Sequence, residues 1–267
     1  MRAKMWAAGV MAGVMAGVGA LATAQPPRIG GDVKAEPGKA PEAVAAKGDA
    51  LTAMLTESRT ALGKLRDYTC TFTRQESVKG ALGGEQVGEM KARTSPVGVY
   101  VRFARPEAIA GMEVAYTAAR KKNDKMLYRP AGVGGAKGFR LIDLDDAKFL
   151  AENRHPVTEW TMSALMDRVS AAVAREKTLK NPVEVFTGEY QFAGRNVVRY
   201  EIVTARPHAF RYAHRMLVYI DKEMSLPLRF EAYGQPKGGE AVGDLFEVYS
   251  FSDVKTNVGL GENAFDF

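Results

Sequence analysis

The sequence predicts a mainly β protein of the α+β class, with one large antiparallel sheet of about nine to eleven strands and two principal helices. Two observations support this prediction. Runs in which apolar and polar residues alternate recur between Tyr68 and Phe251, and this is the period of half-buried strands. The connections between successive runs are short. Parallel pairs need long crossovers, so the strands are expected to pair antiparallel.

The N-terminus has the pattern of a secretory signal peptide over residues 1–24. Arg2 and Lys4 precede an apolar run at 5–21, and small residues at 22–24 offer a cleavage point before Gln25. The run is short and weakly apolar for spanning a bilayer, so an uncleaved anchor is the less favoured alternative. We therefore expect an exported, periplasmic protein that is at most peripheral to the membrane.

Residues 25–47 predict a flexible linker, because Pro, Gly, Ala and Lys dominate and few large apolar residues are available for burial. Residues 48–267 are expected to form a single domain. Without Arg2 and Lys4 the formal net charge falls from +6 to +4. This excess is small and scattered, and it argues against nucleic acid as a partner.

Two amphipathic stretches predict the helices. Asp49 is available as N-cap for the first, and the second is expected at 158–176, with Thr158 and Glu159 as its cap and first turn. The apolar faces are Leu51, Met54, Leu55, Ser58, Leu62 and Leu65 in the first stretch, and Met162, Leu165, Met166, Val169 and Val173 in the second.

The segment LVYIDKEMSLPLRFEAYG, residues 217–234, predicts a hairpin. Asp221, Lys222 and Glu223 lie between two alternating runs and form a polar turn rather than a catalytic acid pair. Pro227 lies near the start of the return strand, where a missing N–H is tolerated. The turn is expected to help line an apolar groove.

Phosphate and metal motifs fail on spacing. In the glycine-rich run at 130–138, Lys137 is followed by Gly138 instead of Ser or Thr, so the run predicts a mobile loop. The acidic cluster at 143–152 beside His155 lacks the turn-forming glycine of a calcium loop, so it is interpreted as solvated charge. No cofactor and no metal are expected.

A catalytic set is also missing from the pattern, so we expect no enzyme. The G-x-S-x-G motif does not occur. Cys70 lies between Tyr68 and Phe72 on the apolar side of a strand, where a thiol usually packs without reacting. A hydrolase with an unrecognised site, using Cys70 or His155, remains as an alternative.

Nine or more strands with one apolar face need a cover, and two helices cover only part of it. A strongly curved sheet with helices in its mouth leaves an apolar groove suited to a greasy ligand. A fully packed interior is the alternative, and the pattern does not separate the two.

Several segments resemble known sequences. YTCTFTRQE, GEMKARTSPVGVYVRF, YIDKEMSLPLRFEAYG and the terminal AFDF occur in an order that resembles the LolA-like superfamily of periplasmic lipoprotein carriers and sensors. More narrowly, YTCTFTRQESVKG, KARTSPVGVYVRFARP, GMEVAY and HPVTEWTMSALM resemble a bacterial domain-of-unknown-function family (number 1571). The resemblance extends from about residue 50 to residue 267.

The resemblance implies an unclosed β-barrel with a helical lid over an apolar cavity that receives acyl chains. It also implies an arginine that holds the lid, and Arg93 is the nearest match. The stretch at 121–155 is longer than a simple carrier needs. Fold likeness does not by itself establish function.

We therefore expect an exported, non-enzymatic binding protein for lipid or the acyl chains of lipoproteins. The alternative is an envelope sensor or interaction module of the same fold, with a protein partner bound through its basic rim or linker. The apolar cavity candidates are Tyr68, Cys70, Phe72, Val99, Val101, Phe103, Met162, Leu165, Met166, Val169, Leu226, Leu228 and Phe230, with Arg93 as the candidate for the lid or a headgroup.

Overall fold

The computed structural model describes residues 33–35, 44–45, 48–120, 124–204, 206–209 and 211–267. The expected signal peptide at 1–24 and most of the expected linker at 25–47 lie outside these residues. No helix in the described part of the chain has the length and apolar character needed to cross a membrane.

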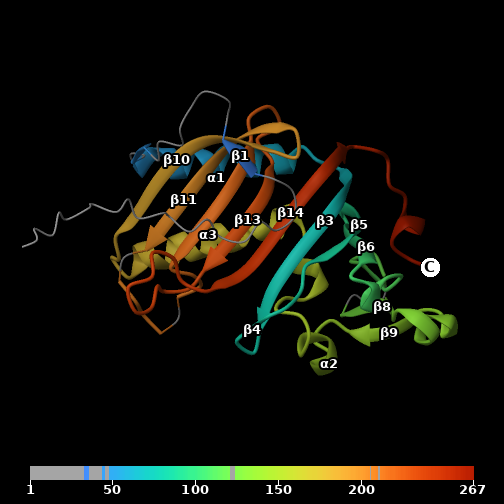
Figure 1. The fold of residues 1–267 in the computed structure, drawn as a ribbon. Coiled ribbons are helices and arrows are strands. Elements are labelled where there is room, and N and C mark those ends of the chain that lie inside the picture. Colours follow the sequence, from blue (N-terminus) through green and yellow to red (C-terminus); the bar gives the residue numbers. More distant parts are fainter. Residues whose placement is uncertain (1–32, 36–43, 46–47, 121–123, 205, 210) are drawn as a thin grey trace, which may run out of the picture.

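One antiparallel sheet dominates the fold (Figure 1). The main strand order is β1-β10-β11-β12-β13-β14-β3-β5-β6-β7-β8-β9, with β2 paired to β10 and β4 paired to β3. The strands are β1 (Val33–Ala35), β2 (Val44–Ala45), β3 (Asp67–Val78), β4 (Ala81–Leu82), β5 (Gln86–Thr94), β6 (Val97–Arg105), β7 (Glu113–Thr117), β8 (Lys125–Arg129), β9 (Arg140–Asp143), β10 (Val183–Phe192), β11 (Arg195–Thr204), β12 (Arg215–Asp221), β13 (Pro227–Tyr233) and β14 (Leu245–Thr256).

The predicted antiparallel, unclosed sheet is confirmed, although the described residues form 14 strands instead of the expected nine to eleven. Most neighbours in the sheet are also neighbours along the chain, and short turns impose antiparallel pairing on them. The main exception is β14, which pairs with β3 and joins the two halves of the sheet; Phe251 lies opposite Phe72. The order starts at β1 and ends at β9 with no pairing between them in the described residues, so the sheet does not close into a barrel.

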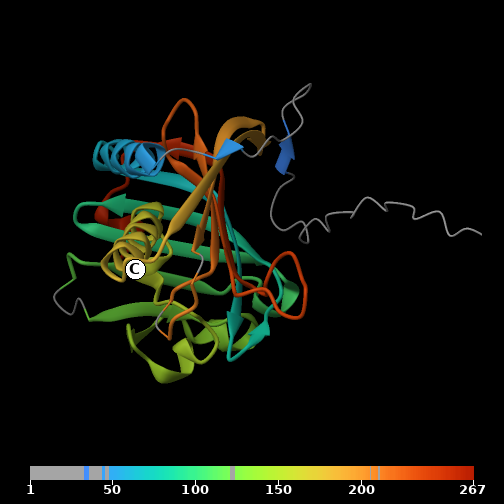
Figure 2. The same ribbon diagram turned by 90° about the vertical axis from the view of Figure 1, so that its left-hand side faces the viewer.

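Two helices lie on the same, concave face of the curved sheet, as Figure 2 shows. They are α1 (Gly48–Gly63) and α3 (Met162–Thr178), and they contact each other. The shorter helices are α2 (Ala147–Leu150), η1 (Glu107–Ile109), η2 (Gly132–Lys137), η3 (Val157–Glu159) and η4 (Glu262–Ala264). The expected glycine loop at 130–138 therefore contains the short helix η2.

Two predicted helix starts need correction. Helix α1 begins at Gly48, so Asp49 lies in its first turn and is not the residue before it. The predicted cap at Thr158 belongs to the separate turn η3, and α3 is capped by Thr161, whose hydroxyl accepts a hydrogen bond from the Ala164 N–H. Pattern alone did not separate the two turns, because both offer a threonine just before the apolar stripe of the helix.

The main core lies between the helices and the concave face. Alternation along β3 places Tyr68, Cys70 and Phe72 inward. The Phe72 ring stacks on Trp160 and Phe251, with centroid separations of 6.2 and 5.6 Å. A second, smaller cluster contains Tyr100, Ala115, Leu127 and Phe265. The chain thus buries apolar side chains on both faces of part of the sheet.

Candidate functional site

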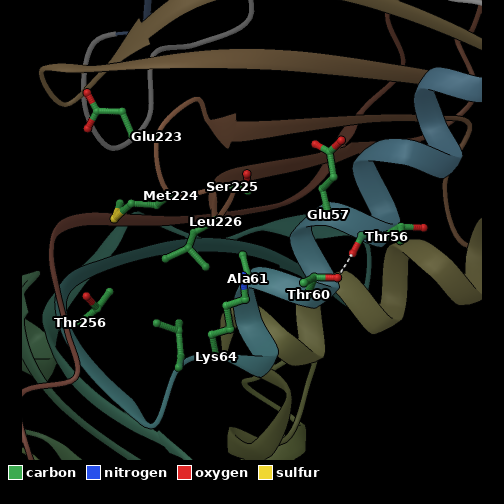
Figure 3. A pocket seen from close by; sticks show the side chains of 11 residues that line it. Thr56, Glu57, Thr60, Ala61, Lys64, Glu223, Met224, Ser225, Leu226 and Thr256 are labelled. Carbon is green, nitrogen blue, oxygen red and sulfur yellow. Dashed lines mark hydrogen bonds between the residues drawn. The ribbon is translucent and has the colours of Figure 1, made fainter.

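A groove of about 520 Å³ separates helix α1 from the turn between β12 and β13 (Figure 3). This volume falls in the range of small-molecule sites. The α1 side contributes one wall, the turn contributes the other, and β14 adds Thr256. The lining residues are Thr56, Glu57, Thr60, Ala61, Lys64, Leu65, Glu223, Met224, Ser225, Leu226 and Thr256.

The turn is held by Asp221, whose side chain is 1% exposed. Its Oδ1 accepts hydrogen bonds from the backbone N–H groups of Glu223 at 2.9 Å and Met224 at 2.7 Å, and Arg195 pairs with the carboxylate. Burial alone raises the pKa of Asp221, but the Arg195 guanidinium and these backbone donors outweigh it and lower the pKa. Asp221 therefore orders one wall of the groove.

The floor of the groove is apolar and meets the core. Leu65 is 8% exposed and Leu226 is 2% exposed, and both belong to the main core cluster. Ala61 and Met224 are partly buried and pack against the same cluster. Pro227 is the first residue of β13 and follows this floor directly, as expected from the sequence.

The rim of the groove is polar and exposed. Glu57, Lys64 and Glu223 are exposed charges on its two sides. On α1, the Thr60 hydroxyl donates to the Thr56 carbonyl oxygen at 2.9 Å, so it is engaged within the helix (Figure 3). An apolar floor under a charged rim suits the binding of an amphipathic molecule. The lining residues include no histidine or cysteine.

The thirteen apolar candidates are all buried in the main core cluster. They are Tyr68, Cys70, Phe72, Val99, Val101, Phe103, Met162, Leu165, Met166, Val169, Leu226, Leu228 and Phe230, and each is less than 9% exposed. Leu226 also lines the groove. The Tyr68 hydroxyl accepts a hydrogen bond from the Met162 N–H at 3.1 Å and ties α3 to the sheet. Their contact with an acyl chain stays a prediction.

Arg93 lies on the other face of the sheet. Its neighbour in β5, Ala92, is in the main core, so alternation directs Arg93 away from it. The guanidinium pairs with Glu262 at 2.7 Å and lies 4.9 Å from the centroid of the Phe265 ring. In this structure Arg93 therefore anchors the C-terminal segment, and it is not part of the groove.

Cys70 and His155, the residues of the hydrolase alternative, do not have the surroundings of a catalytic nucleophile and its general base. Cys70 is a buried free thiol, and burial followed by the charge of Asp253 raises its pKa. His155 contacts two carboxylates, Glu159 at 3.0 Å and Glu247 at 2.7 Å. Neither residue presents an activated nucleophile in these contacts.

The acidic cluster at 143–152 serves local structure. The Asp146 carboxylate accepts hydrogen bonds from the N–H groups of Lys148 and Phe149 and begins α2. Asp143 pairs with Lys125 of the neighbouring strand. Within the described residues, no group of three or more His, Cys, Asp or Glu side chains is arranged to hold a metal ion.

Sequence reasoning missed a buried polar group on the concave face. Arg74 and Glu76 continue the parity of Phe72 along β3 and are 2% and 7% exposed. The Tyr249 hydroxyl donates a hydrogen bond to the Glu76 carboxylate, and the Asn153 Oδ1 accepts one from Arg74. The period-two pattern in FTRQE already placed Arg74 and Glu76 inward. Charged residues are rarely buried without partners, and the pattern does not show which partners these two have.

Most of the chain matches one known protein family. A family model described as "Protein of unknown function (DUF1571)" matches residues 65–267. The chain belongs to this family. The resemblance expected from the sequence is thereby confirmed, and the matched range covers every strand of the sheet from β3 onward.

Several solved structures are similar to this chain at low sequence identity. The MucA/MucB complex of Pseudomonas aeruginosa matches with 16% identity and a TM-score of 0.47, over 82% of this chain and 61% of that chain. Lipoprotein LppX of Mycobacterium tuberculosis matches with 12% identity and a TM-score of 0.46, over 80% and 99%. A LolA superfamily protein from Nitrosomonas europaea matches with 9% identity and a TM-score of 0.32, over 84% and 99%.

This chain spans less than two thirds of the length of the MucB chain in that complex. A search of curated proteins finds no match. Since these likenesses are distant, the function proposed for the DUF1571 chain rests on its own residues.

Proposed function

We propose that this DUF1571 protein is an exported, non-enzymatic binding protein that takes the acyl chain of a lipid or lipoprotein at the groove beside α1. The observation that carries the proposal is the apolar floor formed by Leu65 and Leu226, which is continuous with the core and opens to solvent between α1 and the β12–β13 turn. In this proposal the signal at 1–24 is removed, the linker at 25–47 precedes the domain at 48–267, and the protein works in the periplasm.

The arrangement of α1 supports an opening at this site. Its buried face, which includes Leu51, Met54 and Leu62, packs on α3 and the sheet. The side toward the groove carries the exposed residues Glu57 and Lys64. A small outward shift of α1 lengthens the groove toward the apolar candidates, because those side chains belong to the same core cluster as Leu65 and Leu226 on the groove floor.

The test is native mass spectrometry of protein purified from envelope fractions, followed by lipid extraction. We expect a population carrying bound lipid in the native protein. Ala61 lines the groove and is partly buried, so Ala61→Trp fills the space and should abolish lipid copurification. Ala53→Trp, on an exposed position of the same helix, is the matched control and should retain the lipid.

Two results contradict the proposal. One is a native protein that carries no lipid after gentle purification. The other is lipid that remains in Ala61→Trp at the level of Ala53→Trp, which places it elsewhere on the molecule. A protein partner captured from envelope extracts, with no lipid and with sensitivity to deletion of residues 25–47, supports the sensor alternative instead.

A further inference from the structure

A second pocket, of about 350 Å³, lies at the opposite end of the concave face. Figures 1 and 2 both place α1 at the top of the molecule and α2 at the bottom, and this pocket is lined by residues of α2 and of the strands β3, β5, β8 and β9. We name it the Arg74 pocket. Its lining residues are Arg74, Gln86, Ile109, Met112, Tyr128, Arg140, Ile142, Asp146, Lys148, Phe149, Glu152 and Asn153.

Arg74 is a charged group with incomplete hydrogen bonding. The side chain is 2% exposed, its Nε donates to the Gln86 Oε1 at 2.8 Å, and its Nη2 donates to the Asn153 Oδ1. Both acceptors are neutral amides. The Nη1 group donates no hydrogen bond, and its one ion pair is with the Glu76 carboxylate at 3.7 Å, beyond hydrogen-bond distance. A buried donor without an acceptor is costly, so this guanidinium has capacity for an anionic ligand.

The surroundings hold Arg74 in a fixed orientation. Its guanidinium lies 3.9 Å from the centroid of the Trp160 ring and 5.2 Å from that of Phe103. Glu76 is itself engaged, because it accepts hydrogen bonds from the Arg154 N–H at 2.9 Å and from the Tyr249 hydroxyl. The donor is therefore oriented before any ligand arrives, which lowers the entropic cost of binding.

The charge on the pocket walls is positive on balance. Arg74, Arg140 and Lys148 oppose the carboxylates of Asp146 and Glu152. Asp146 already accepts two backbone hydrogen bonds at the start of α2. Arg140 and Lys148 are exposed and provide cations at the entrance, whereas Arg74 lies deep.

The remaining walls are apolar or aromatic. Ile109, Met112 and Ile142 are partly buried, and Phe149 is 7% exposed with its ring 6.3 Å from that of Tyr128. A ligand with a single anionic head and a compact apolar body satisfies both kinds of wall. A highly charged ligand would not cover the apolar walls, and a neutral ligand would not form an ion pair with Arg74.

We propose that the Arg74 pocket is a second binding site, specific for a small amphipathic carboxylate whose head pairs with Arg74 and whose apolar part contacts Met112, Ile142 and Phe149. The site is independent of the groove beside α1, because the two are lined by different residues. The same monoanionic chemistry is offered by a free fatty acid and by a phospholipid headgroup. The size of the pocket favours the free acid.

The test is isothermal titration of the full chain with octanoate. With the groove beside α1 blocked by Ala61→Trp, we expect octanoate to fill one site per chain, and we expect neither octanol nor inorganic phosphate to fill that site. Arg74→Met removes the charge at similar length and should weaken binding by about tenfold or more. Arg140→Gln and Lys148→Gln change exposed residues and should weaken binding by about two- to threefold.

Blocking variants keep the test decisive if Arg74→Met folds poorly. Met112→Trp fills the pocket from a partly buried position and should abolish octanoate binding. Ala61→Trp fills only the groove and should leave it unchanged, as should Lys91→Gln in β5, which lies outside the pocket. The proposal is overturned if octanoate does not bind, if Met112→Trp binds it normally, or if Ala61→Trp alone removes it. Equal occupation by dihexanoyl phosphatidic acid assigns the site to a lipid headgroup and contradicts the free acid.

Discussion

The two ends of the concave face hold their charged side chains in different ways. Beside α1, Glu57, Lys64 and Glu223 are exposed around an open groove. Toward α2, Arg74 and Glu247 are 2% and 0% exposed and belong to a network of hydrogen bonds and ion pairs. The exposed charges beside α1 stay solvated if α1 moves. Moving the elements near α2 apart would leave the buried charges there without their partners. The comparison indicates that the α1 end opens and the α2 end stays rigid.

The largest expected effect tests the rigid end. Trp160 is 1% exposed, stacks on Phe72 and Phe149, lies under Arg74, and donates from Nε1 to the His155 carbonyl oxygen at 3.1 Å. Trp160→Ala leaves a cavity and should lower the free energy of unfolding by about 3–5 kcal/mol, measured by urea denaturation. Val133→Ala, at a position 95% exposed, is the control. A loss below about 1 kcal/mol contradicts the rigid-end interpretation.

A second prediction concerns the turn that forms one wall of the groove. Asp221→Asn removes the charge that pairs with Arg195, so the free energy of unfolding should fall by about 1–3 kcal/mol at pH 7. Lys222→Gln, at the exposed neighbour, should change it by less than about 0.5 kcal/mol.

The pH dependence of the Asp221 effect follows from its lowered pKa. Because the pKa is lowered in the folded state, the ionised Asp221 stabilises the protein fully at a pH above its ordinary pKa of 3.8. This stabilisation is lost as the pH falls through the lowered pKa. The difference between the native protein and Asp221→Asn should therefore shrink in acid. A difference that is constant from pH 7 to below pH 3 contradicts this assignment.

A smaller effect is expected at the rigid end, where His155 should make the free energy of unfolding depend on pH. Burial alone lowers the pKa of His155, but hydrogen bonds to Glu159 and Glu247 and the charge of Glu247 outweigh it, so the pKa is raised. The added stability is complete below the ordinary pKa near 6.5 and is lost as the pH rises through the raised value.

His155→Gln keeps a donor for Glu247 but does not titrate. Its free energy of unfolding should depend less on pH between about 6 and 9 than that of the native protein. Urea denaturation across this range measures the slope. His214→Gln provides a control histidine, because the pKa of His214 is lowered, mainly by burial. Equal slopes in native protein and His155→Gln refute the role given to His155.

The smallest effect is expected where α1 meets α3 at the surface. Arg59 lies 3.7 Å from Asp167, and their side chains are 65% and 74% exposed. Arg59→Ala should change the free energy of unfolding by about 0.5 kcal/mol or less. Hydrogen exchange should nevertheless show faster exchange of α1 than of β3 in the native protein. Exchange of α1 as slow as that of β3 removes the contrast between the two ends.

Local pattern predicted much of this molecule. The period-two runs located the strands, and the buried stripe of α3 matches the predicted residues Met162, Leu165, Met166, Val169 and Val173. The prediction failed at helix starts, as with Thr158 and Thr161, where two similar signals lie three positions apart. It gave no prediction for Arg74, because the sequence does not show which partners make an inward charge acceptable.

The sequence by itself determined most of the strands, the apolar stripe of α3 and the corner at Asp221, since each depends on residues close together in the chain. The order of several such segments also indicated the family. The tertiary structure decided the pairing of β14 with β3, the groove between α1 and the β12–β13 turn, and the surroundings of Arg74. Arg74 and Asn153 are 79 positions apart. Contacts over such separations depend on how the whole sheet curves and stacks, and no short window of sequence contains that information.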